Sequence, residues 1–374
     1  MTSDDILARL VAFPSVVGRP NGDIVGWIVS YLAAHGIHAR VLMGPEGDRS
    51  NLFATIGRSE DAGLVLSGHM DVVPAEEPDW TGDPFRLRRD GHRLYGRGTS
   101  DMKGFLAAVL AAVPQLVALR PSRPIHLAFS YDEEAGCRGV PHLIARLPEL
   151  SAKPACAVIG EPSGLRAILA HKGKAAARIA IRGRSGHSSR PDLGLNAIHA
   201  MTGVLGAVVA AAAAARQGPQ DPSFEPPYST LQVGTLAGGD ALNIIPALCM
   251  AEIEARAISG QSPVALLEPV RDALAGLERE GFETSWEPLS DYPALALPRT
   301  APIAGLVAEV TGKEPLPAVS YGTEAGLYQA AEIDAIVCGP GEIGRAHKAD
   351  EYIERGELVA SERMILDLAG RFNA

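Results

Sequence analysis

The chain has 374 residues, more than one hydrophobic core usually organises, so two domains are expected. Apolar residues make up 47% and charged residues 21%, proportions that are typical of a globular protein and exclude a largely disordered chain. The net charge is −10 and the sequence contains no basic stripe. Nucleic acid and anionic membranes are therefore not expected as partners.

The N-terminus is acidic, where a secretory signal would be basic, and no apolar segment with a cleavage site follows it. The longest apolar run covers residues 203–215, which is too short to cross a bilayer and is interpreted as a helix of a soluble protein. The four cysteines are far apart and form no CxxC pair, so neither a disulfide framework nor a cysteine zinc site is expected. These features predict a cytoplasmic protein.

Residues 4–159 alternate between helical and β-rich stretches, which predicts an α/β domain with a mixed, largely parallel sheet flanked by helices. The candidate strands cover residues 39–41, 51–56, 64–67, 125–130 and 157–159. Polar residues follow three of these strands directly, at His69, at 132–134 and at Glu161. Because open α/β sheets bind ligands outside the carboxyl ends of their strands, we expect these polar segments at one edge of the sheet.

The pattern changes after residue 173 and predicts an inserted α+β domain with an antiparallel sheet. Its expected strands cover residues 175–181, 230–235, 248–257 and 282–286, and its expected helices 196–216 and 264–279. A helix at 303–310 and a strand at 335–337 predict that the chain then returns to the first domain. The predicted boundaries are 1–173 and 289–374 for the first domain and 174–288 for the insert.

His69 and Asp71 stand two positions apart, so in extended backbone their side chains lie on the same side. Asp71 can then hold the far ring nitrogen of His69, an arrangement that orients metal-binding histidines. A surface histidine beside a turn aspartate is the alternative. Asp101 precedes an apolar helix at 105–113, so a helix N-cap is the alternative to a metal ligand at that position.

Asp132, Glu133 and Glu134 place three carboxylates at the end of the strand 125–130. Adjacent like charges at a buried edge are costly unless cations share the site, whereas a solvated acidic turn is the alternative. Successive side chains of extended backbone point to opposite sides. We therefore expect Glu133 and Glu134 to differ in role, one binding metal and the other handling protons.

Glu161 and His347 complete a set of two imidazoles and three carboxylates with His69, Asp101 and Glu134. Two metal ions that share one bridging carboxylate need about this many ligands, because each catalytic ion keeps a position open for water. A solvated loop acid and an ordinary loop histidine are the alternatives for Glu161 and His347. The sequence contains no HExxH, GxSxG or GxxxxGK[ST] motif, which excludes a thermolysin-like protease, a serine hydrolase and a P-loop protein.

His187 lies in a Gly- and Ser-rich segment, residues 183–189, of the inserted domain. A hydrogen-bond donor from a second domain can stabilise an oxyanion. A histidine within a Gly/Ser turn is the alternative.

Nine motifs along nearly the whole chain resemble the co-catalytic zinc aminoacylases and carboxypeptidases, the family that includes the acetylornithine deacetylases, the succinyl-diaminopimelate desuccinylases and glutamate carboxypeptidase. In chain order they are SGHMDVVP, GRGTSDMKGF, YDEEAGCRG, GEPSG, HKGK, GRSGHSSRP, NIIP, YGTEAGLYQ and CGPGEIGRAHKADEY. The resemblance implies a zinc-peptidase-like catalytic domain with an inserted lid domain, and a homodimer formed through the lid. It also implies two divalent ions, for which zinc is the first expectation and cobalt or manganese are also suitable.

The family pattern also implies roles for individual residues. His69 and Glu161 would hold one metal ion, Glu134 and His347 the other, and Asp101 would bridge them. The peptide bond that follows Asp101 would be cis. Glu133 takes the place of the general base and Asp71 that of the partner of His69. His187 matches the lid histidine that reaches the substrate carbonyl, and Asn243 and Arg256 match lid positions that contact the substrate.

The segments YGTEAGLYQ and CGPGEIGRAHKADEY are most similar to acetylornithine deacetylases, in which Glu324 would contact a cationic amino group. The implied reaction removes acetate from N-acetylornithine, a small N-acyl amino acid of arginine biosynthesis. Ser100 stands where these enzymes often have cysteine, and GEPSG replaces a more usual GEPT. A desuccinylase, an exopeptidase and a non-catalytic relative that kept the fold are the alternatives, the last disfavoured because every ligand position and Glu133 are filled.

Overall fold

The computed structural model describes residues 1–58 and 60–374 and divides into two compact units. The first unit comprises residues 1–170, 295–318 and 323–374, and the second comprises residues 171–294 and 319–322. Each unit has its own hydrophobic core. The chain leaves and re-enters the first unit at the short strands β8 (Ala170–His171) and β13 (Leu295–Ala296).

The first unit is built on a six-stranded sheet with the order β1-β2-β6-β3-β7-β14. The strands are β1 (Arg40–Met43), β2 (Ser50–Ile56), β6 (Ile125–Ser130), β3 (Leu64–His69), β7 (Cys156–Pro162) and β14 (Asp334–Gly339). The four strands from β6 to β14 are parallel, and β1 and β2 add an antiparallel edge. The predicted fold class, an α/β domain around a mixed and largely parallel sheet, is confirmed.

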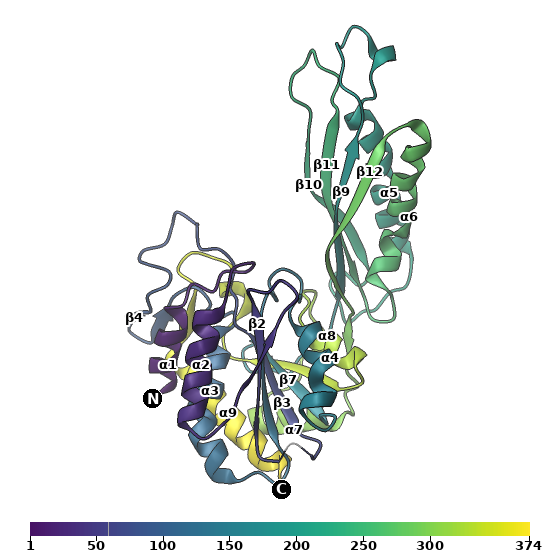
Figure 1. Cartoon of the computed structure of the whole chain (residues 1–374). Coiled ribbons are helices and arrows are strands. Elements are labelled where there is room, and N and C mark those ends of the chain that lie inside the picture. The colour runs from purple at the N-terminus through teal and green to yellow at the C-terminus, as the bar shows by residue number, and fades with distance from the viewer. Residues whose placement is uncertain (59) are drawn as a thin grey trace. The chain divides into compact units, whose positions relative to one another are not determined.

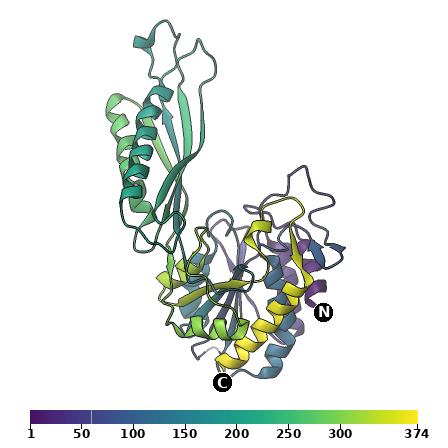
Figure 2. The ribbon, with the colours of Figure 1, turned by 180° about the vertical axis from the view of Figure 1, so that it is seen from behind.

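Helices cover both faces of this sheet (Figure 1). One layer contains α1 (Ser3–Val11), α2 (Gly22–Ala34), α3 (Lys103–Leu119), α7 (Pro302–Thr311) and α9 (Arg355–Phe372), and the other contains α4 (Val140–Leu150) and α8 (Ala325–Ala330). Seen from behind, α9 lies along the outside of its layer, and it packs on α3 (Figure 2). Because both faces are covered, every residue of β3, β6 and β7 is buried, as parallel strands between helix layers usually are.

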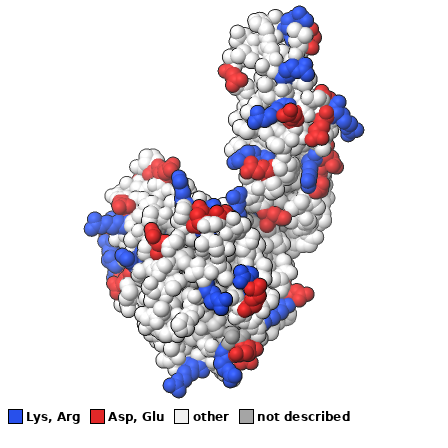
Figure 3. All heavy atoms as spheres, in the orientation of Figure 1, with Lys and Arg blue, Asp and Glu red and all other residues white. Residues whose placement is uncertain are grey.

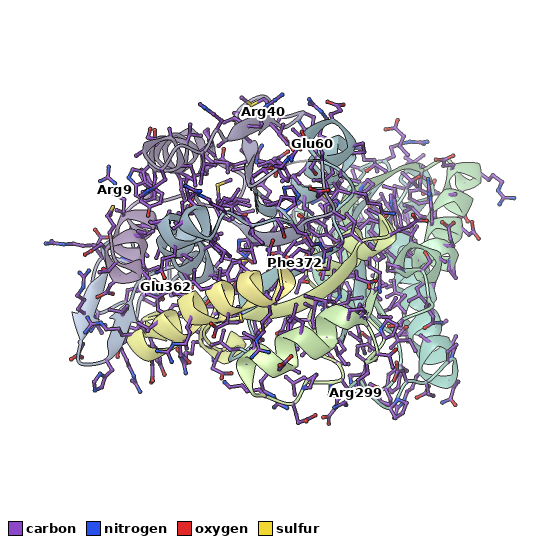
Figure 4. The ribbon with its side chains drawn as sticks, turned by 90° about the horizontal axis from the view of Figure 1, so that it is seen from below. Arg9, Arg40, Glu60, Arg299, Glu362 and Phe372 are labelled. Atoms are coloured by element: carbon purple, nitrogen blue, oxygen red, sulfur yellow. The ribbon has the colours of Figure 1, made fainter. Side chains whose placement is uncertain are left out.

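α3 is the central helix of the first layer, and its residues 103–113 are all buried. A helix that is apolar all round belongs in the interior, which explains the apolar run that the sequence shows at 105–113. At the C-terminal end of α9, the guanidinium of Arg123 lies 3.9 Å from the ring centre of Phe372, which is labelled in Figure 4. A three-stranded sheet of β4 (Arg88–Asp90), β5 (Arg93–Tyr95) and β15 (Tyr352–Glu354) completes the unit.

The second unit is a four-stranded antiparallel sheet with two helices on one face. Its strands are β9 (Gly173–Arg182), β10 (Thr230–Gly238), β11 (Leu248–Ala257) and β12 (Glu283–Tyr292), and its helices are α5 (Ala197–Gln217) and α6 (Pro263–Gly276). Burial alternates along β9, which is the pattern of a strand with one face in the core. On the other face, Arg178 pairs with Glu252 and Glu287, and Figure 3 shows such acidic and basic groups next to each other.

α5 lies within one residue of the helix predicted at 196–216. The apolar run at residues 203–215 is too short to cross a bilayer, but the whole helix of 21 residues is long and apolar enough by length and composition alone. Its inner face, with Met201, Val204 and Val208, is buried against the sheet of the second unit. Helices packed on a sheet pass the same length test, so α5 is weak evidence for a membrane span.

Gly160 in β7 packs directly against the ring of Phe105 in α3. A Cβ atom added at Gly160 would lie 2.0 Å from Cγ of Phe105, whereas nothing lies within 4 Å of one added at Gly305 in α7. We expect Gly160→Ala to destabilise the protein by roughly 1–3 kcal/mol or more through overpacking, and Gly305→Ala to be neutral or stabilising by up to about 1 kcal/mol. Thermal unfolding followed by circular dichroism checks this, and equal melting temperatures for both variants would contradict the packing.

Candidate metal centre

Asp101 lies between two of the predicted histidine ligands. Its Oδ1 is 3.2 Å from Nε2 of His69, and its Oδ2 is 3.3 Å from Nε2 of His347. The N-cap of α3 is Met102, which makes no side-chain cap bond, so Asp101 does not cap the helix as the alternative reading supposed. The Asp101-Met102 peptide bond is cis, as the family resemblance implied. The carboxylate is placed so that two cations can share it.

Each histidine also faces a second carboxylate. Nε2 of His69 is 3.8 Å from Oε1 of Glu161, and Nε2 of His347 is 3.0 Å from Oε1 of Glu134. Ligand atoms of His69, Asp101 and Glu134 lie within 4.8 Å of one another, as do those of His69, Glu133 and Glu161. The structure therefore brings together all five residues that the sequence predicted as metal ligands.

The parallel strands bring these ligands to one edge of the sheet. β6, β3 and β7 are neighbours, and His69 is the last residue of β3 while Glu161 belongs to β7. Both strands are longer than the predicted 64–67 and 157–159, because the β3·β6 ladder continues to the pair His69 and Ser130 and the β7·β14 ladder to the pair Pro162 and Gly339. His69 and Glu161 are thus held by the hydrogen-bonded sheet itself.

The crowding of acidic groups shifts their proton affinities. Burial raises the pKa of Glu161 well above its usual range, and neighbouring Asp101 and Glu133 raise it further. Burial and the charge of Asp101 likewise raise the pKa of Glu134. Hydrogen bonds with Asp101 and Glu134 raise the pKa of the His347 ring to about 10. The pKa values of the two glutamates are thus raised by burial and by like-charge repulsion, and that of His347 by its attraction to carboxylates; bound cations would relieve the repulsion.

Asp71 connects His69 to the acidic turn, which comprises residues 132–134. Its side-chain oxygens accept hydrogen bonds from the backbone N–H groups of Glu133 and Glu134, at 3.2 and 3.1 Å. Nδ1 of His69 lies 3.0 Å from the backbone oxygen of Asp71 and 3.5 Å from its carboxylate. The nearer partner of the ring is thus the carbonyl, which the sequence pattern did not indicate. Either partner fixes the tautomer that leaves Nε2 free for a metal ion.

The three adjacent carboxylates have three different sets of contacts. Asp132 accepts hydrogen bonds from the backbone of Gly18, at 2.8 Å, and from Arg49, at 2.6 Å. Oε1 of Glu133 accepts from the thiol of Cys137 at 3.3 Å, while Glu134 faces His347. Asp132 has a positive φ of 49°, so a turn separates these side chains, and not the extended backbone that the sequence argument assumed.

Glu133 lies in surroundings that raise its affinity for a proton. Burial raises its pKa to about 8, and the nearby Glu134 and Asp71 carboxylates act in the same direction, against the opposing effect of His69. Glu133 is half-buried and lies beside His69 and Glu161, where a reacting water would be held.

Comparisons with known proteins decide the family. The model of the Peptidase family M20/M25/M40 matches residues 65–371. The chain belongs to this family. A curated acetylornithine deacetylase of Photorhabdus laumondii is 33% identical over 377 aligned positions, which cover 98% of this chain and 96% of that protein. A second acetylornithine deacetylase, from Pasteurella multocida, is 34% identical, and the alignment covers 95% of this chain and 92% of that protein.

Solved structures share the fold of the M20 family chain. A metallo-carboxypeptidase of the M20 family from Sulfolobus solfataricus superposes with a TM-score of 0.81 at 18% identity, covering 98% of both chains. Human carnosine dipeptidase 1 gives a TM-score of 0.78 at 15% identity, covering 99% of this chain and 97% of that chain. A Bacillus subtilis protein described as a dinuclear metal binding peptidase gives 0.67 at 14% identity, covering 99% and 97%. At these identities the likeness concerns the fold alone.

The donor set fits divalent ions by its own chemistry. Oε1 of Glu161 is buried without a hydrogen-bond partner among the described residues, although it points toward His69. A buried carboxylate oxygen without a partner is costly, and a cation would satisfy it. Imidazole and carboxylate together suit zinc and similar transition metals. The M20 chain therefore carries a side-chain arrangement suited to divalent cations, with Asp101 between its two imidazoles.

Two of the predicted substrate contacts lie side by side in the second unit. The loops that carry His187 and Asn243 pair with each other, because the backbone N–H of Ser188 donates to the carbonyl of Asn243 at 3.1 Å. Nδ1 of His187 accepts the backbone N–H of Ser189 at 3.2 Å. This bond places the proton of a neutral ring on Nε2. Both His187 and Asn243 are exposed.

Arg256, the third predicted contact of the insert, lies on β11 and is half-buried. Its Nε donates to Oε1 of Glu254 at 3.1 Å, and Lys174 lies 3.4 Å from the other oxygen of the same carboxylate. The guanidinium is thus held in place by a carboxylate that it shares with a lysine. Its remaining N–H groups are the ones suited to a substrate carboxylate.

Glu324 is placed differently from the other predicted substrate contacts. It is 1% exposed, and its two carboxylate oxygens accept hydrogen bonds from Ser67 at 2.5 Å and Ser130 at 2.8 Å. Ser67 belongs to β3 and Ser130 ends β6, so Glu324 ties the two strands together just before His69 and the acidic turn. A substrate amino group would have to reach a carboxylate that is buried and already accepts a hydrogen bond at each oxygen. This geometry favours a role in holding the strand ends.

Two charged residues near the centre received no role from the sequence. Arg97 and Glu351 are both 1% exposed and form an ion pair at 3.0 Å. They belong to the motifs GRGTSDMKGF and CGPGEIGRAHKADEY, but their pairing joins segments more than 250 positions apart. The only sequence signal was their presence in motifs that also contain ligands.

Metal removal should inactivate and destabilise the protein. Stripping divalent ions with a chelator should abolish turnover, and Zn²⁺ added at about 100 times its dissociation constant should restore roughly 2.7 kcal/mol of stability. Glu161→Gln should weaken this stabilisation because the position loses its negative charge, whereas Glu332→Gln, at an exposed ion pair with Lys153, should not. Thermal shift with metal titration measures the effect, and equal shifts for the two variants would contradict the ligand assignment.

Proposed function

We propose that this chain is a metal-dependent acetylornithine deacetylase that hydrolyses N-acetylornithine to ornithine and acetate. The observation that carries the chemistry is Asp101, whose two carboxylate oxygens face two different imidazoles, 3.2 and 3.3 Å away. The substrate is supported by relatives of that name with 33% and 34% identity over nearly the full chain. Their similarity extends over both units, and so over the residues of the insert that would select a substrate.

The proposed centre holds two divalent ions. His69 and Glu161 would hold one ion and His347 and Glu134 the other, and Asp101 would be available to both. Zinc fits this donor set best, and cobalt and manganese also suit mixed imidazole and carboxylate ligands. When bound, such ions lower the pKa of a coordinated water and polarise the amide carbonyl.

Glu133 acts as the general base and acid. Its carboxylate takes a proton from the attacking water and passes it to the departing amine. Cys137 supports this role, because its thiol, whose pKa is raised well above the usual value by burial, stays protonated and donates to one Glu133 oxygen. Asp71 fixes the backbone of the same turn through the N–H of Glu133.

The second unit contributes the remaining substrate contacts in this proposal. Nε2 of His187, protonated because Nδ1 accepts the N–H of Ser189, donates to the oxyanion that develops on the amide oxygen. Asn243 lies in the paired loop and binds the substrate beside it. Arg256 binds the substrate carboxylate, for which a guanidinium is a well-matched partner.

A homodimer formed through the second unit and a cytoplasmic location are further parts of the proposal. The outward face of α5 supports the dimer, since Val209 on that helix is 67% exposed and the small residues Gly206, Ala210 and Ala213 are exposed near it. Small residues allow close approach of a second helix. Light scattering of the purified protein would count the subunits, and a monomer would contradict this part.

The substrate proposal is tested by steady-state kinetics of the metal-loaded protein on a panel of N-acyl amino acids. We expect kcat/KM to be highest for N-acetylornithine, with N-succinyl-diaminopimelate and dipeptides as the main comparisons. A preference for the succinyl substrate would indicate a desuccinylase, and a preference for dipeptides an exopeptidase. A metal-loaded protein that hydrolyses none of these amides would indicate a non-catalytic relative.

The roles of Glu133 and His187 are tested by substitution. Glu133→Gln should lower kcat by about 10²–10⁴-fold, the usual contribution of a general acid–base group, while the metal content stays at the wild-type level. His187→Ala should lower kcat by about 10²–10³-fold, as the loss of an oxyanion donor does, again with unchanged metal content. Acetate release and elemental analysis measure both, and wild-type kcat in either variant would refute that residue's role.

A further inference from the structure

Glu351 is a buried carboxylate that is saturated by donors from one short loop. It is 1% exposed. Its Oε1 accepts the backbone N–H groups of Ser100 and Asp101, at 2.8 and 3.0 Å. Its Oε2 accepts the backbone N–H of Gly98 at 2.9 Å and Nη1 of Arg97 at 3.0 Å. Three backbone donors and one guanidinium thus converge on a single side chain.

This carboxylate joins the two loops that carry Asp101 and His347. Asp101 is the last residue of the loop that Glu351 binds, and His347 precedes Glu351 by four positions. Two more bonds reinforce the connection, because the N–H of Gly96 donates to the backbone oxygen of Glu351 at 2.9 Å and Arg97 donates to the carbonyl of Lys348 at 3.2 Å. The positions of the bridging carboxylate and of His347 are therefore coupled through Glu351.

Backbone contacts are the means by which Asp101 can be oriented. Among the described residues, the hydrogen bonds of its side chain go to His69 and His347 alone, which are themselves predicted ligands. The direction of its Cα–Cβ bond depends on the peptide units around it, and Glu351 fixes the N–H groups of Ser100 and Asp101. Converging backbone N–H groups form an anion-binding concavity, and bonds from a guanidinium to a carboxylate are among the stronger hydrogen bonds in proteins.

We propose that Glu351 is a positioning residue for the metal centre, which holds the backbone of the bridging ligand Asp101 in register with the loop of His347. The inference rests on the proposed binuclear metal chemistry. Groups that orient metal ligands typically contribute 10–100-fold to metal affinity or activity. Because Asp101 is shared by both ions, displacing it weakens both metal sites.

The test compares Glu351→Gln with Glu77→Gln. Glutamine keeps the size of the Glu351 side chain but replaces one carboxylate oxygen with an N–H₂ group. This group would face N–H donors that the oxygen accepts in the wild-type protein. Glu77 is the matched control, since its carboxylate also pairs with Arg97, at 2.5 Å, and its other side-chain partner among the described residues is Trp80. At fixed pH, calorimetric titration of metal-free protein with Zn²⁺ should give a 10–100-fold lower affinity for Glu351→Gln and wild-type affinity for Glu77→Gln.

Kinetics on the metal-saturated proteins provide a second measurement. Glu351→Gln should lower kcat with little change in KM, because Asp101 is misaligned while the substrate contacts remain. If Glu351→Gln does not fold, Glu351→Asp replaces it: the charge is kept but the shorter side chain cannot reach both Arg97 and the backbone, so a smaller loss of Zn²⁺ affinity is expected.

The outcomes separate this inference from the proposed function. A wild-type protein that binds no metal ions would refute the proposed function itself. A wild-type protein that binds Zn²⁺, together with a Glu351 variant of unchanged affinity and kcat but lower melting temperature, would show that Glu351 only stabilises the fold. Equal loss of Zn²⁺ affinity in Glu351→Gln and Glu77→Gln would also overturn the proposal, because the effect would then come from Arg97.

Discussion

Repulsion between crowded carboxylates is the constraint on which the first unit depends. Four acidic side chains meet two imidazoles at one edge of the sheet, namely Asp101, Glu133, Glu134 and Glu161. Burial and mutual repulsion raise the pKa of three of them, and Oε1 of Glu161 has no hydrogen-bond partner among the described residues. Folding such a cluster is unfavourable unless cations bind it, so the unfavourable contacts are themselves an argument for the metal centre of the family.

The sheet makes this crowding possible because parallel strands end at the same edge. β6, β3 and β7 place the acidic turn, His69 and Glu161 next to one another, and both faces of the strands are buried under helices. Glu324 adds a cross-connection behind the edge through Ser67 and Ser130. The rigidity that a shared metal site needs therefore comes from the hydrogen-bonded sheet and not from the loops alone.

Neighbouring residues of the same type serve different purposes because their contacts differ. Asp132 accepts hydrogen bonds from Gly18 and Arg49, Glu133 accepts one from the thiol of Cys137, and Glu134 lies beside the His347 ring. Glu351 is a carboxylate like the acidic ligand candidates, yet its donors are backbone N–H groups and Arg97. An acidic side chain surrounded by N–H donors is satisfied without a metal ion, whereas one surrounded by other acids and imidazoles is not.

The sequence alone determined the family resemblance, the α/β class and the candidate ligands His69, Glu134 and Glu161, because alternating apolar stretches and polar residues after strands are local patterns. Asp101 and His347 do not directly follow a predicted strand, and their motifs indicated them as candidates. The sequence also placed the elements of the insert, with β11 (Leu248–Ala257) at its exact bounds. Tertiary structure decided what depends on distant partners. In the folded chain, Asp71 accepts hydrogen bonds from the backbone of residues 133 and 134, and Glu324 is buried behind the strands. Arg97 pairs with Glu351 across more than 250 positions. A carboxylate in a sequence has no visible partner, and its role follows from whichever donors, acids or imidazoles the fold brings beside it.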